Sequence, residues 1–198
     1  MMHIDPARDA LVIVDVQNDF CPGGALGVPG GDAVVPLLNR YAERFAAAGA
    51  PVFASRDWHP AKTMHFKAYG GVWPPHCVQG TQGADFHPQL VLPPGSAIVS
   101  KGMDPSQDAY SCFQAETADG MPFAATLGEL GVGRLFVGGL ATDYCVKSTV
   151  VDGVHEGFEM VVLADAIAAV DLAPGDGAKA LDEMRAAGAQ MIRLGDLE

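Results

Sequence analysis

The chain has 198 residues, 49% of them hydrophobic, and a formal net charge of -12 from 24 acidic and 12 basic residues. One α/β domain with a sizeable core fits this length, and the acidic balance with dispersed lysines and arginines argues against nucleic-acid and membrane partners. No run approaches the roughly 20 apolar residues of a membrane span, no export signal is visible and four scattered cysteines indicate reduced thiols, so we expect a cytoplasmic protein.

Short apolar runs alternate with amphipathic segments along the whole chain. The predicted strands are residues 10–17, 51–55, 96–100, 134–140, 159–164 and 190–194, and the predicted helices are residues 32–48, 123–130, 145–156 and 177–187. The apolar runs are continuous rather than alternating, which is typical of parallel strands buried on both faces. We therefore expect a three-layer α/β/α fold with a six-stranded, mainly parallel sheet.

Residues 57–94 interrupt this pattern. The segment is rich in Pro, Gly, His and Trp, lacks clear periodicity and is too long for an ordinary connection, which usually marks a functional loop. We expect residues 1–198 to form a single domain that carries this segment as an insertion.

Cys145 lies where the predicted strand 134–140 passes through a glycine-containing turn into a helix. The partial positive charge of a helix start, together with a nearby lysine, can lower the pKa of a thiol and make it a nucleophile. The alternative is a small buried apolar residue, which is the commoner role of an intracellular cysteine.

Three further charged residues, Asp15, Asp57 and Lys101, fall near the carboxyl ends of predicted strands, where ligands collect in open parallel sheets. Asp15 interrupts an apolar run, so it is either a general base with a raised pKa or an acid hydrogen-bonded to loop backbone. Lys101 is either an exposed lysine or a cation that favours a thiolate and holds substrate.

A second group of polar residues lies in the long loop: Asp57, His59, His65 and His76. Asp57 and His59 are one residue apart, which in an extended segment places both side chains on the same side. One carboxylate with three imidazoles suits zinc, iron or manganese. Cys77 is a rival ligand, although its side chain would tend to diverge from that of its neighbour His76.

Together these motifs resemble the isochorismatase-like cysteine hydrolases. The Asp-x-His and Trp-Pro-Pro-His motifs of the loop are more specific to the nicotinamidase, or pyrazinamidase, members. The matching segments span most of the chain and are residues 13–20, 56–59, 73–80, 101–102 and 138–145.

The resemblance implies roles for individual residues. The implied catalytic triad is Asp15, Lys101 and Cys145. The implied metal ligands are Asp57, His59 and His76, with His65 joining them in some members only. The implied oxyanion hole consists of the backbone N–H groups of Ala141 and Cys145, after a cis peptide bond before Ala141. The implied substrate-binding residues are Phe20 and Trp73, which sandwich the ring, and the wall residues Leu26 and Tyr110.

The activity implied by the resemblance is hydrolysis of nicotinamide or pyrazinamide to the acid and ammonia through a cysteine thioester, with one divalent metal ion per chain and a homo-oligomer as a possible assembly. Three alternatives remain open from the sequence. They are a metal-hydroxide hydrolase in which Cys145 is incidental, a related hydrolase of isochorismate or another small amide or carbamoyl compound, and a non-catalytic metal-binding protein.

Overall fold

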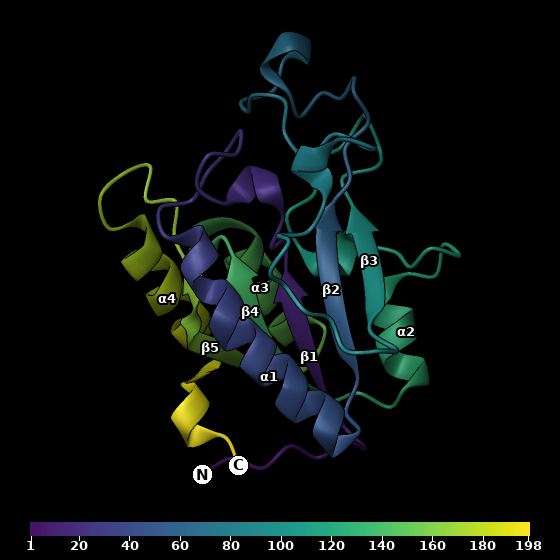
Figure 1. The fold of residues 1–198 in the computed structure, drawn as a ribbon, viewed down its shortest axis with the longest axis vertical. Coiled ribbons are helices and arrows are strands. Elements are labelled where there is room, and N and C mark those ends of the chain that lie inside the picture. Colours follow the sequence, from purple (N-terminus) through teal and green to yellow (C-terminus); the bar gives the residue numbers. More distant parts are fainter.

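The computed structural model describes residues 1–198 and contains one six-stranded sheet with the strand order β3-β2-β1-β4-β5-β6 (Figure 1). The strands are β1 (Asp9–Val14), β2 (Val52–Asp57), β3 (Ala97–Lys101), β4 (Arg134–Leu140), β5 (Glu159–Ala168) and β6 (Gln190–Ile192). All five neighbouring pairs are parallel. The predicted fold class is confirmed, and the sheet is wholly rather than mainly parallel.

Four helices cover the two faces of this sheet: α1 (Val35–Ala48), α2 (Phe123–Glu129), α3 (Lys147–His155) and α4 (Asp176–Ala187). One apolar cluster joins α1, in front of the sheet in Figure 1, to one face, and a second cluster joins residues of α2, α3 and α4 to the other. The central strand β1 serves both clusters, because Leu11 and Ile13 point to one face while Val12 and Val14 point to the other. This two-sided burial explains the continuous apolar runs in the sequence.

Several element boundaries differ from those predicted, among them the carboxyl ends of β1 and β5. Strand β1 ends at Val14, because Asp15 adopts a positive φ of 48° that leaves the extended conformation. Strand β5 continues to Ala168, four residues beyond its apolar run, after a shift in its register with β4.

Gly139 allows β4 to approach β1 closely. Its φ is +122°, and a Cβ atom added there would lie 2.1 Å from the main-chain oxygen of Val14. Only a residue without a side chain fits this position without a shift of the backbone. The contact lies at the carboxyl end of both strands, directly below the site described next.

The strand order reverses between β1 and β4, so the crevice at their carboxyl ends is the expected ligand site of such a sheet. The long loop segments that follow β2 rise above this end of the sheet (Figure 1). Both termini lie at the opposite end, where Met2 pairs with Leu197.

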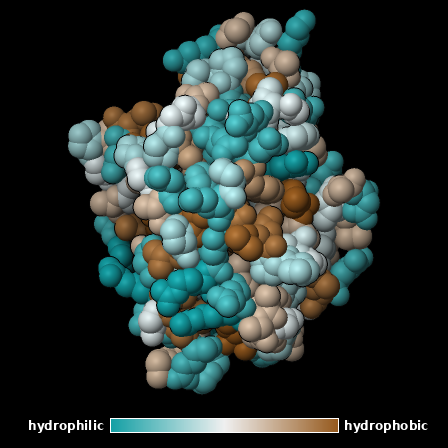
Figure 2. All heavy atoms as spheres, in the orientation of Figure 1, coloured by the Kyte–Doolittle hydropathy of each residue, from teal (hydrophilic) through white to brown (hydrophobic).

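The surface agrees with the acidic composition. Figure 2 shows a mostly hydrophilic face on the side of α1, with apolar residues in small groups. None of the helices combines the length and the apolar character that crossing a bilayer would require.

Candidate active site

Three residues from three different strand ends meet in a buried cluster. The Lys101 Nζ atom lies 2.8 Å from Asp15 Oδ2 and 3.5 Å from Cys145 Sγ, and it also pairs with Asp57 Oδ1. All four side chains are almost completely buried. The structure thus brings together the thiol, the acid and the lysine that the sequence singled out, and it adds Asp57 as a second partner of the lysine.

Local structure fixes each member of this cluster. Asp15 is the first residue after β1, and its Oδ1 accepts a 2.7 Å hydrogen bond from the Ser55 hydroxyl of β2. Lys101 is the last residue of β3. Cys145 lies in a π-helical turn, Thr142–Val146, that leads directly into α3. Ser55 was not anticipated, although it is a polar residue within a buried strand.

Burial dominates the electrostatics of the cluster. It raises the pKa of Asp15, against the opposing effect of the Lys101 ammonium. Burial alone would lower the pKa of Lys101, but the facing carboxylates of Asp15 and Asp57 raise it well above its usual value. The lysine is therefore a permanent cation here.

The expected lowering of the Cys145 pKa is wrong for this structure. Burial raises this pKa well above its ordinary value, Lys101 only partly opposes it, and the carboxylates of Asp15 and Asp57 raise it further. Cys145 therefore rests as a thiol. A carboxylate oxygen of Asp15 lies within 4.8 Å of the sulfur and is the available acceptor for its proton.

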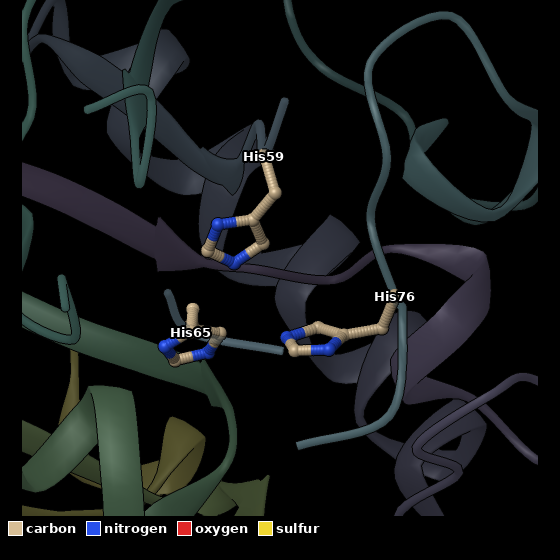
Figure 3. A group of neighbouring side chains, drawn as sticks. All are labelled: His59, His65 and His76. Atoms are coloured by element: carbon tan, nitrogen blue, oxygen red, sulfur yellow. The ribbon is translucent and has the colours of Figure 1, made fainter. Parts of the chain in front are cut away.

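Next to this cluster, three imidazoles point toward one another (Figure 3). One ring nitrogen from each of His59, His65 and His76 lies within 4.8 Å of the other two, and all three residues are buried. Asp57 Oδ2 lies 3.5 Å from His59 Nε2 and 3.9 Å from His76 Nε2. The two oxygens of Asp57 therefore face different groups, with Oδ1 toward Lys101 and Oδ2 toward the imidazoles.

The second nitrogen of each imidazole has its own acceptor. His59 Nδ1 lies 3.0 Å from the Gly102 carbonyl, His76 Nδ1 lies 2.8 Å from the Pro74 carbonyl, and His65 Nδ1 contacts the Asp108 carboxylate. These contacts leave each Nε2 atom free to act as a ligand.

The charge state of the site suits a divalent metal ion. Burial lowers the pKa of His65 and lowers that of His76 to about 4, so both rings are neutral donors at neutral pH. The buried His59 Nε2 has no hydrogen-bond partner. Three imidazole nitrogens with one carboxylate are a ligand set that holds zinc and similar ions.

Two rival metal sites are less suitable. Carboxylate and thiol atoms of Asp15, Asp57 and Cys145 also cluster, but the Lys101 ammonium already pairs with both carboxylates. Cys77 is buried but does not belong to either cluster, and its main-chain N–H donates a 2.7 Å hydrogen bond to Asp19.

A cavity of about 190 Å³ opens above both clusters. All four residues predicted to bind substrate line it, together with the proposed oxyanion residues: Phe20, Leu26, Trp73, Tyr110, Ala141 and Cys145. The indole N–H of Trp73 donates a 2.9 Å hydrogen bond to the Tyr110 hydroxyl, which fixes both rings. The imidazoles of His65 and His76 also reach this cavity, so a bound molecule would meet the thiol and the metal site together.

Four lining residues were missed in the sequence: Gly27, Tyr144, Val170 and Leu172. The last two follow β5 at the carboxyl end of the sheet, and this position is the only signal that could have identified them. The carboxylate of the buried Asp143 accepts hydrogen bonds from the main-chain N–H groups of Val170 at 3.0 Å and Asp171 at 2.9 Å, so the turn that contains Cys145 holds this wall of the cavity in place.

The peptide bond between Leu140 and Ala141 is cis, as the resemblance implied. The Ala141 carbonyl accepts hydrogen bonds of 3.1 Å from the N–H groups of both Tyr144 and Val146. These bonds close the turn that carries the sulfur.

A family model, the isochorismatase domain, matches residues 9–196, and the chain belongs to this family of α/β proteins. Among characterised relatives, the nicotinamidase of Escherichia coli K12 is 40% identical, and the match covers 96% of each chain.

Two solved structures are also similar to this chain in three dimensions. The pyrazinamidase of Pyrococcus horikoshii in complex with zinc is 41% identical with a TM-score of 0.86, covering 94% of this chain and 99% of the other. The L. infantum protein PnC1 in complex with nicotinate is 34% identical with a TM-score of 0.89, covering 100% of this chain and 98% of the other.

Proposed function

We propose that this protein is a metal-dependent amidase that hydrolyses nicotinamide, and also pyrazinamide, to the acid and ammonia through a thioester on Cys145. One observation carries the proposal: a buried thiol with a carboxylate and a lysine adjoins a three-imidazole site, and both face one aromatic cavity. The similarity to nicotinamidases and pyrazinamidases supports the choice of substrate. Because all four cysteines are free, we propose the reducing cytoplasm as its location.

In this proposal the aromatic cavity binds the pyridine ring. Phe20 and Trp73 offer ring faces and edges against which a flat heteroaromatic ring packs. Asp57 and the three imidazoles would hold the metal ion, which when bound supplies a Lewis acid for the ring nitrogen. The cavity walls would hold the ring with its carboxamide toward Cys145.

In the proposed first step Cys145 is acylated, which requires a group that accepts the proton of the thiol and a carbon atom that the sulfur attacks. Asp15 takes the proton of Cys145 as the sulfur bonds to the carboxamide carbon, and the N–H groups of Ala141 and Cys145 stabilise the resulting oxyanion. Asp15 then returns the proton to the departing nitrogen, the C–N bond breaks and ammonia leaves. Lys101 keeps the charge of Asp15 and of the forming thiolate compensated throughout.

Deacylation repeats these roles with water. Asp15 removes a proton from a water molecule whose oxygen attacks the thioester carbon. The C–S bond then breaks, Cys145 recovers its proton from Asp15, and the carboxylic acid product is released and loses its own proton to water.

Ammonia release from nicotinamide and pyrazinamide tests this function, before and after chelation and with zinc, iron or manganese added back. We expect Cys145→Ala to lower turnover by at least ~1,000-fold, because removing the nucleophile leaves only binding and oxyanion effects. The matched control is Cys21→Ala, which removes another buried thiol outside the cavity and should retain activity.

Two results would contradict the proposal. Release of no ammonia with any of the three metals would exclude an amidase of these substrates. Retention of most turnover by Cys145→Ala would instead assign the attack to a metal-bound hydroxide, and no acyl adduct would then be found by intact mass on the native enzyme.

A further inference from the structure

Asp108 distinguishes one imidazole of the metal site from the other two. His59 and His76 are backed by neutral main-chain carbonyls, whereas His65 is backed by a carboxylate. Asp108 comes from the irregular segment after β3, 43 residues from its partner. It is about half exposed, so its removal does not open the core.

We propose that Asp108 is a positioning residue that makes His65 a metal ligand. Its carboxylate accepts the Nδ1 proton of His65, so the ring presents the Nε2 lone pair to the other imidazoles. The inference rests on the proposed metal-dependent function and deepens it, since it assigns this chain a site of Asp57 and three histidines.

The surrounding contacts show that the pair is built into the fold. The N–H of Met64, next to His65, donates a 2.9 Å hydrogen bond to the Pro105 carbonyl, which ties the two loops together. On the other side, the Gln114 side chain donates a 3.2 Å hydrogen bond to the main-chain oxygen of Asp108. The loops are therefore fixed on both sides of the contact.

The ring of His65 is also fixed from the opposite direction. It stacks on His59, with ring centroids 4.6 Å apart and an angle of 20° between the planes. Stacking sets the plane of the ring but leaves open which nitrogen points inward. The carboxylate of Asp108 determines that choice, because it needs a proton donor and Nδ1 faces it.

The negative charge has a second effect, on the strength of the metal bond. A carboxylate behind a ligating imidazole makes its free nitrogen more basic, and loss of such a partner costs about 10–100-fold in metal affinity. We expect a loss within this range for Asp108→Ala, and a smaller loss for Asp108→Asn, whose amide oxygen still accepts the Nδ1 proton.

The experiment measures zinc affinity by competition with a chromogenic chelator, in the absence of substrate. The matched control is Asp104→Asn, which changes a carboxylate of the same loop that contacts only Ser106 and Gln107. We expect unchanged affinity for this control. A double-mutant cycle with His65→Ala completes the set, and we expect Asp108→Ala to cost nothing further once His65 is absent.

A nitrogen NMR spectrum of the histidine rings provides a readout that a merely structural role would not change. In the native protein His65 should carry its proton on Nδ1, and in Asp108→Ala the two tautomers should mix while the His59 and His76 signals stay in place. The proposal is overturned if Asp108→Ala binds zinc as tightly as the native protein, or if it weakens zinc binding equally in the His65→Ala background.

These readouts separate the two proposals. Weaker zinc binding by Asp108→Ala in a protein that releases no ammonia would support the role of Asp108 and refute the proposed amidase. If the native protein releases ammonia and Asp108→Ala leaves its zinc affinity unchanged, the positioning role of Asp108 is refuted and the proposed amidase is supported.

Discussion

Lys101 is a cation buried between two carboxylates, Asp15 and Asp57. Such a group is costly to bury alone, and each carboxylate in turn depends on it. Loss of the lysine would leave two buried negative charges close together without a counterion. The residue therefore has a structural role in addition to its proposed part in the chemistry.

We predict that Lys101→Met lowers the free energy of unfolding by about 3–5 kcal/mol, the usual cost of breaking a buried ion pair. Urea denaturation of the metal-free protein measures the effect. Lys147→Met is the control, because Lys147 pairs with Glu183 in a much more exposed setting, and its loss should cost less than about 1 kcal/mol. Equal losses for the two variants would contradict the prediction.

The sequence predicted that Asp15, Lys101 and Cys145 approach one another, because the ends of parallel strands meet at one edge. The sequence also placed Asp57 at this edge, but it could not predict that one carboxylate oxygen of Asp57 pairs with Lys101, because side-chain orientation is not recorded in a strand-end position. The pKa of Cys145 was predicted in the wrong direction, because a sequence reveals the turn and the lysine but not the depth of burial.

At the scale of the elements, β4 and β1 approach each other closely at Gly139. Gly139→Ala would place a methyl group against the Val14 carbonyl at a positive φ. We predict a loss of at least about 2 kcal/mol in unfolding free energy. Gly128→Ala in α2 is the control: its added methyl meets nothing within 4 Å, and the variant should gain up to about 1 kcal/mol. A Gly139→Ala protein as stable as this control would show that β4 can move away from β1.

The loop after β5 depends on one side chain of the turn Thr142–Val146. Asp143→Ala would remove the acceptor of the Val170 and Asp171 N–H groups. We predict faster hydrogen exchange at these two amides, measured by mass spectrometry. Asp182→Ala, an exposed change on α4 that removes only a contact to Arg185, should leave their exchange unchanged. Unchanged exchange in Asp143→Ala would mean that packing alone holds the loop.

All six strands and four helices were identified in the sequence, because buried parallel strands and amphipathic helices leave clear periodic patterns. Their ends were less certain. The end of β1 depends on the φ of Asp15, and the extension of β5 depends on pairing with β4, neither of which a local pattern records. The irregular segment 102–111, which places Asp108, has no periodicity to interpret.

At the scale of the whole molecule, the proposed metal ion would tie the irregular loop to the sheet, because its ligands come from the end of β2 and from three positions in the loop. We predict that chelation lowers the melting temperature. Zinc at 1,000 times its dissociation constant should add about 4 kcal/mol to the stability of the native state.

Differential scanning fluorimetry with and without zinc measures this effect. Cys145→Ala should keep the full response to zinc, and His59→Ala should lose most of it, since His59 belongs to the imidazole cluster. If neither the chelator nor added zinc changes the melting temperature, the metal makes no contribution to the stability of the fold and the prediction is contradicted.

The strand order β3-β2-β1-β4-β5-β6 divides the sheet between β1 and β4 into two contiguous stretches of chain. Asp15, Lys101 and every proposed metal ligand belong to the first stretch, whereas Cys145 belongs to the second. Substitutions that inactivate the protein should therefore fall into two classes according to their position in the chain. Substitutions in the first stretch can abolish cation binding and turnover together, whereas substitutions in the second should give inactive proteins that still bind the cation.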